Sequence, residues 1–220
     1  MLGYILSKLN LLILVTAIFA IISFFAIGLT DITKVNEAKE LSFLIKEKTF
    51  ALVSASAYCL SDSHVVPDGL TVAGGRFYYV MAISKEEITI DSEPVNIVIF
   101  SVFPRDEIKK AYANSDYKPK AIAAESFRTK AEIHLFSRSY NGTGYEGAQQ
   151  EYTGTLEEPV FVDPQAITRG NGIEFIKEVE LGQPKLYLIV CNDAVCEADK
   201  TYVGEIIHAP TQQDEGGFKC

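Results

Sequence analysis

The chain has no tryptophan, only two methionines and three histidines, and no stretch that concentrates lysine or arginine. DNA and RNA bind to basic stripes that displace their counterions, so the missing stripe argues against a nucleic-acid partner. The formal net charge of −9 is typical of a solvated surface that repels itself. Apolar residues make up 48% of the 220 positions, a high share for a fully soluble protein, and one segment explains the excess.

Sequence signatures of catalysis and of metal binding are also missing. His64, His134 and His208 have no second metal ligand at helical spacing, and the H-E-x-x-H pattern does not occur. The phosphate-binding glycine loops, the G-x-S-x-G elbow and the kinase motifs are absent as well. We therefore expect a protein that is not an enzyme, with no catalytic residue, no cofactor and no metal site. An extracytoplasmic enzyme without a recognisable motif is the minor alternative.

The apolar excess lies near the amino terminus. Residues 9–29 read LNLLILVTAIFAIISFFAIGL and contain no charge. At 1.5 Å per residue, a helix of this length spans a bilayer core of about 30 Å. Residues 1–30 are thus predicted to be an uncleaved transmembrane anchor, with the lipid bilayer as the partner of residues 9–29. A cleaved signal peptide, whose apolar region is usually shorter, is the alternative.

The next segment, residues 31–58, has no glycine and no proline. Its apolar residues recur at intervals of three, four and seven, which predicts an amphipathic helical stalk. The transmembrane helix and this stalk are expected to be nearly continuous.

From residue 59 to 220 we expect a β-rich globular domain. Aromatic and β-branched runs bounded by turn residues predict seven to nine strands. The ten candidate runs are residues 76–84, 87–90, 95–103, 121–127, 131–137, 151–155, 159–162, 173–181, 185–191 and 200–208. Residues 106–114 predict one short helix. Short turns between strands favour an antiparallel sheet or sandwich, so the fold class is α+β.

Four cysteines indicate the compartment: Cys59, Cys191, Cys196 and Cys220. An even number behind an anchor is typical of an oxidising exterior, where disulfides persist. Of the three possible connectivities, we favour Cys191 with Cys196, closing a hairpin loop, and Cys59 with Cys220, fastening the chain end. Unpaired thiols and a zinc site are the alternatives. Asn141, in Asn141-Gly142-Thr143, is the one glycosylation acceptor. Together these features predict a cytoplasmic amino terminus and an extracellular globular domain.

An apolar helix that continues into an amphipathic one, followed by an antiparallel β head with late cysteines, resembles the layout of type IV pilins and pilin-like proteins. The anchor-first arrangement is also similar to small surface proteins of archaea. Gly3-Tyr4 offers the one glycine at which a leader of the pilin type would be cut, and no glutamate stands early in the apolar stretch. The resemblance therefore leaves processing and polymerisation open.

Three functions remain. The first is a membrane-anchored structural or interaction protein that displays a β-rich binding domain at the cell surface, where it associates with itself or with another surface protein. The second is a pilin-like filament subunit assembled through its amino-terminal helix, and the third is the enzyme without a motif. Tyr78, Tyr79, Tyr140, Tyr145 and Tyr152 are read as contact residues on loops or as parts of the core.

Overall fold

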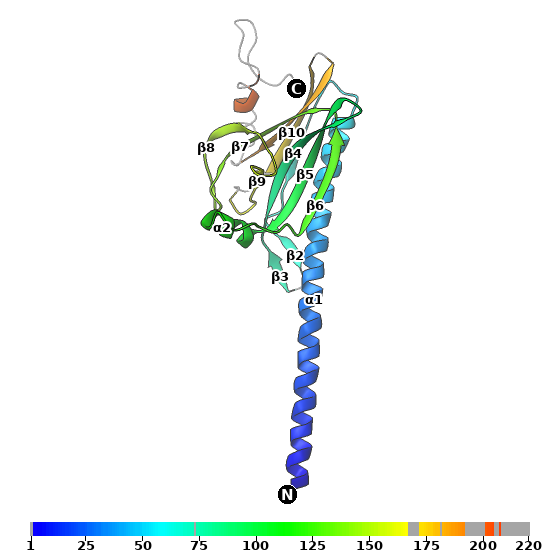
Figure 1. Ribbon diagram of the computed structural model, residues 1–220, viewed down its shortest axis with the longest axis vertical. Helices are drawn as coiled ribbons and strands as arrows, with labels where there is room; N and C mark the ends of the chain where they lie inside the picture. The colour runs from blue at the N-terminus through cyan, green and yellow to red at the C-terminus, as the bar shows by residue number, and fades with distance from the viewer. Residues whose placement is uncertain are drawn as a thin grey trace.

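The computed structural model describes residues 2–72, 74–166, 172–180, 182–191, 201–204 and 207, with side chains from residue 10 onward. In this part of the chain, a long amino-terminal helix leads into a head of mixed sheets (Figure 1). The predicted order, an apolar helix followed by a β-rich α+β region, is confirmed at that level.

Helix α1 (Leu2–Ser54) is uninterrupted over 53 residues, which corresponds to a length of about 80 Å. It joins the predicted anchor and the predicted stalk into one rod (Figure 1). Every side chain from residue 10 to 29 is exposed. In the upper half, Ala38, Leu41, Ile45 and Leu52 are buried, and their spacing places them on one face of the helix.

Two sheets form the head. The first has the strand order β1 (Cys59–Val65), β10 (Gly172–Glu180), β11 (Gln183–Val190), β7 (Glu132–Tyr140) and β8 (Tyr145–Tyr152). The second has the order β6 (Ala123–Thr129), β5 (Glu93–Pro104), β4 (Tyr79–Ile90) and β9 (Val160–Val162). A separate hairpin, β2 (Leu70–Val72) with β3 (Gly75–Phe77), lies beside α1.

The main core lies between the sheets. It combines Tyr79 and Phe100 of the second sheet with Phe175 and Leu188 of the first, and the buried face of α1 joins the same cluster. Helix α1 contacts both β6 and β1, which are edge strands of the two sheets. The helix therefore closes one open side of the sandwich, where two strand edges would otherwise be exposed.

Polar contacts also attach α1 to these edges. Lys46 lies 3.4 Å from Glu125 of β6, and Lys48 lies 3.7 Å from Asp62 of β1. Lys177, buried on β10, donates to the carbonyl of Ala55 just beyond the helix end, where carbonyl groups lack helical partners.

The short helix α2 (Arg105–Ala113) follows β5 directly and confirms the helix predicted at residues 106–114. Asp106 and Glu107 lie in its first turn and Lys110 in its last, an arrangement that complements the helix dipole. Ile108 is buried and packs with Val80 and Tyr140. This contact holds α2 on the outer face of the second sheet.

Three details of the predicted β domain are corrected. Residues 76–84 and 87–90 were expected to form two strands, but β4 runs unbroken from Tyr79 to Ile90 and pairs with β5 across a two-residue turn. Asp91 and Ser92 in that turn have positive φ values of 51° and 68°, as such tight hairpin turns require. The second correction concerns the first sheet, which is not purely antiparallel because its strands β11 and β7 pair in parallel.

The third correction concerns residues 200–208, which were predicted to be a strand. Residues 201–204 and 207 are helical instead. Val203 and Ile207 are four positions apart, so one helical face carries both. They pack on Phe136, Tyr187 and Ile189, on the outer face of the first sheet.

Candidate functional site

The exposed apolar half of α1 is the first candidate. In the described chain it is the one helix whose length and composition suffice to cross a membrane, and its most apolar stretch is entirely unburied. Phe19, Phe24 and Phe25 are each more than half exposed. A contiguous apolar surface of this size marks an interaction with lipid or protein. By position and composition, this helix is able to serve as a membrane anchor or as a signal sequence.

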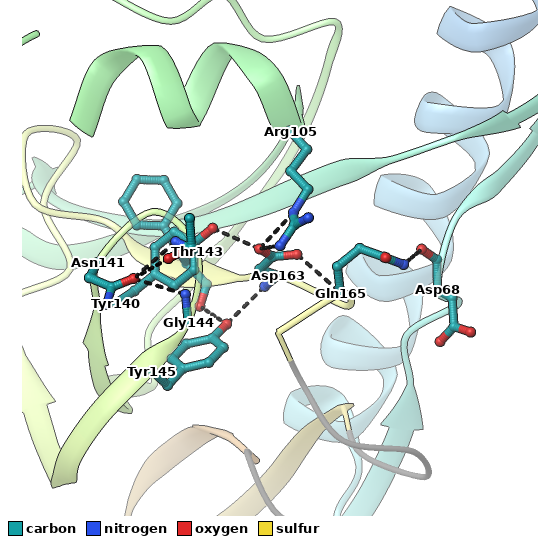
Figure 2. A network of polar contacts seen from close by, with 10 residues as sticks. Asp68, Arg105, Tyr140, Asn141, Thr143, Gly144, Tyr145, Asp163 and Gln165 are labelled. Atoms are coloured by element: carbon teal, nitrogen blue, oxygen red, sulfur yellow. Dashed lines mark hydrogen bonds and ion pairs between the residues drawn. The ribbon is translucent and has the colours of Figure 1, made fainter. Parts of the chain in front are cut away.

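The second candidate is a buried polar network around Asp163, directly after β9 (Figure 2). The Asp163 carboxylate is fully buried, and its Oδ2 lies 2.9 Å from Arg105 Nη2 and 3.0 Å from Arg105 Nε. Tyr140 donates its hydroxyl proton to the same oxygen at 2.8 Å. The backbone amide of Gln165 donates to Oδ1 at 3.0 Å. Both carboxylate oxygens are therefore occupied.

A second tyrosine continues the network through the backbone. The amide of Asp163 donates to the Tyr145 hydroxyl at 2.8 Å, and that hydroxyl donates to the carbonyl of Phe161 at 2.9 Å. The Gln165 side chain reaches the carbonyl of Asp68, which precedes β2, at 2.7 Å (Figure 2). The network thus links the ends of β5, β7 and β9 with the start of β8.

Burial and the negative charge of Asp163 both raise the pKa of Tyr140, with burial the larger cause. Burial also raises the pKa of Tyr145. Both phenols therefore keep their protons and remain hydrogen-bond donors. Chemically, the arrangement suits a clamp that fixes loops: its carboxylate is neutralised by Arg105 and satisfied by neutral donors.

The third candidate is an aromatic groove, with a volume of about 470 Å³, between α2, the end of β8 and the segment before β9. Tyr112, Tyr152 and Phe161 provide its rings, Pro159 adds apolar surface, and Glu157 and Glu158 provide carboxylates. The sequence singled out Tyr152 but missed Tyr112, which it placed on a short helix without a role. Only the packing of α2 brings these two tyrosines to one groove.

A fourth candidate is a more polar pocket of about 650 Å³, near the other end of β4. His134 lies there with Nδ1 2.7 Å from Glu151 and Nε2 3.3 Å from Glu132, and its ring stacks on Tyr187. The described residues contain no group of three or more histidine, cysteine or carboxylate side chains arranged to hold a metal ion. We therefore read His134 as a residue of a charged sheet face.

The cysteines occupy separate places. Cys59 begins β1 and pairs with Glu178, near the end of β10. The backbone amide of Cys191 donates to the carbonyl of Gly172, which begins β10. Both cysteines are disulfide-bonded. Six residues of extended strand separate the two places by about 20 Å, while a disulfide requires Cα atoms within about 7 Å. Cys59 and Cys191 are therefore not bonded to each other. Cys196 and Cys220 lie outside the described residues, so the favoured pairing stays a prediction.

Asn141 is exposed in the turn between β7 and β8. Its Oδ1 accepts hydrogen bonds from the amides of Thr143 and Gly144, at 3.0 and 2.9 Å. An exposed loop is where a glycosylation acceptor must lie; modification of Asn141 stays a prediction.

Comparison with known proteins assigns no family. No protein-family model matches the chain, and neither a curated protein nor a solved structure matches it.

Proposed function

We propose that the protein is a membrane-anchored, non-enzymatic surface protein that displays its β-rich head outside the cytoplasm. The observation that carries this proposal is the two-part character of α1. One half is apolar and fully exposed, and the other half is part of the core of the head. Because α1 runs without a break from its apolar half to Ala38, Leu41 and Ile45 in the core, an uncleaved helix would hold the head at the membrane, whereas cleavage after residues 9–29 would release it.

The absence of an enzymatic role is part of the proposal. It is supported by Asp163, the fully buried carboxylate of the clamp, whose oxygens are engaged by Arg105, Tyr140 and the Gln165 amide. The disulfide-bonded state of Cys59 and Cys191 supports an oxidising exterior for the head.

Membrane retention is tested with two matched substitutions on α1. Phe19→Lys places a charge at the centre of residues 9–29, which costs about 3 kcal/mol in a bilayer. Phe43→Lys makes the same change on an exposed position beside the head. After alkaline washing, we expect Phe43→Lys to stay in the membrane pellet and Phe19→Lys to be depleted from it. Equal retention of both variants would contradict the anchor.

Orientation needs its own measurement. Protease added to intact cells should digest a tag on the head and spare a tag at the amino terminus. The reverse pattern would place the head in the cytoplasm.

A second candidate, a pilin-like filament subunit, is favoured by one observation: α1 passes from its exposed half into the head without a break. Such a rod is able to pack against sister helices in a filament core as well as against lipid. Intact mass and particle size after detergent extraction separate the two candidates. A full-length chain in a small particle supports the anchored display protein. A trimmed amino terminus in high-mass polymers supports the filament subunit.

A further inference from the structure

The aromatic groove beside α2 is built to hold its rings in place. The Tyr112 ring meets Tyr140 edge-on, with centroids 5.5 Å apart, and Phe161 at 6.1 Å. The turn after β7 closes over the same ring: a Cβ on Gly142 would lie 2.9 Å from Tyr112, so only glycine permits this approach. Tyr112 nevertheless remains 46% exposed. A rigid and accessible aromatic surface offers contact area at a low entropic cost.

Two adjacent carboxylates border these rings. Glu157 and Glu158 are both exposed, and neither forms an ion pair with a described residue. The backbone that carries them is fixed, because the Glu158 amide donates to Thr155 at 3.2 Å. Thr153 donates to Glu158 Oε2 at 3.3 Å, which leaves the other oxygen open. The groove therefore combines aromatic faces with uncompensated negative charge.

This combination is complementary to one kind of side chain. A guanidinium group is planar, stacks on aromatic rings and pairs with carboxylates through two parallel hydrogen bonds. A lysine ammonium is a more strongly hydrated point charge and gains less from such a surface. We propose that the groove formed by Tyr112, Tyr152, Phe161, Glu157 and Glu158 binds an arginine side chain presented by a partner protein. This inference rests on the proposed function, since it names what the displayed head recognises.

The proposal is tested on the full-length chain in a non-ionic detergent, with tyrosine rings labelled with carbon-13. Tyr112→Phe and Tyr152→Phe each remove one signal, which assigns the two groove tyrosines while keeping their rings. The probes are three capped peptides, Gly-Gly-Arg-Gly-Gly and its counterparts with lysine or with citrulline, the neutral isostere of arginine. We expect saturable shifts of both signals with the arginine peptide. Binding should be about tenfold weaker or worse with citrulline, which loses the charge, and intermediate with lysine.

Carboxylate variants provide the second arm. Glu157→Gln together with Glu158→Gln should weaken binding of the arginine peptide about tenfold, since each charged pair is lost while shape is kept. Glu40→Gln, an exposed position on α1, is the matched control and should leave the affinity unchanged.

Several results would overturn the proposal. These are equal binding of the citrulline and arginine peptides, no loss of affinity on replacing both carboxylates, or no saturable shift at all. Shifts of the Tyr112 signal with protein concentration alone would instead assign the groove to contacts between copies of this chain. These results are independent of membrane retention. A protein that keeps its anchor but ignores the peptide contradicts this inference alone, and a protein that binds it but leaves the membrane contradicts only the anchor.

Discussion

Replacing Asp163 with asparagine should lower the free energy of unfolding of the head more than a substitution at an exposed position does. In Asp163→Asn, the new side chain carries an NH₂ group that must face either Arg105 and Tyr140 or the backbone amide of Gln165. All of these groups are donors, so either orientation places a donor against a donor. The Arg105 guanidinium, 19% exposed, then loses its counter-charge. Removing one member of a buried ion pair costs about 3–5 kcal/mol, which is a large part of the 5–15 kcal/mol that stabilises a typical domain.

The assay is urea denaturation of the detergent-solubilised protein, followed by near-ultraviolet circular dichroism of its tyrosines. Asp68→Asn is the matched control, because Asp68 enters the network through its backbone carbonyl and not its carboxylate. A double-mutant cycle with Arg105→Gln should give a coupling energy above about 1 kcal/mol, as expected for groups in one network. A loss below about 1 kcal/mol for Asp163→Asn, or additivity in the cycle, would refute the clamp.

Three further outcomes are expected. Ile45→Ala, in the buried face of α1, should lower the free energy of unfolding by about 2–5 kcal/mol. Leu44→Ala, on the exposed side of the same helix, should change it by less than about 1 kcal/mol. Equal denaturation midpoints of the two variants would contradict the placement of α1 in the core. Gly142→Ala should lower the thermal midpoint, because φ is +90° and a Cβ would press on a ring, whereas Gly144→Ala meets open space and should leave it unchanged. Burial raises the pKa of Tyr79 above its ordinary value of 10.0. The buried Tyr79 phenol therefore contributes fully to the free energy of unfolding below pH 10. This contribution falls as the pH rises further, because the unfolded state releases the phenol proton first. Denaturation between pH 8 and 11 should show a loss of stability above pH 10, to which Tyr140 and Tyr145 also contribute because burial raises their pKa values as well. The slope of this loss should be smaller in Tyr79→Phe by about 1.4 kcal/mol per pH unit.

Local pattern was enough to predict the helices and the main strands. The uncharged run at residues 9–29 and the periodic apolar residues after it indicated α1, because helix burial repeats every 3.6 residues. The strands β5 and β11 were visible as aromatic and β-branched runs. The edge strand β1, with the sequence CLSDSHV, was missed because most of its side chains are exposed and its polar residues suggested a turn.

What the sequence did not reveal depends on contacts between distant segments. The parallel pairing of β11 with β7 joins strands more than 40 residues apart, and no local signal encodes it. Residues 200–208 were predicted to be a strand from their β-branched residues, yet Val203 and Ile207 use helical spacing to cover a sheet. The clamp around Asp163 and the aromatic groove each combine residues from three or more segments, so neither leaves a motif along the chain.

The placement of α1 also has a mechanical consequence. Its upper half is attached along its length to β6 and β1 through buried apolar residues and the pairs Lys46–Glu125 and Lys48–Asp62. A pull along the helix axis therefore loads all of these contacts at once, in shear, instead of opening them one after another. Because the helix has no break below the head, such a load reaches the sandwich undiminished, and the head turns and tilts together with the rod that carries it.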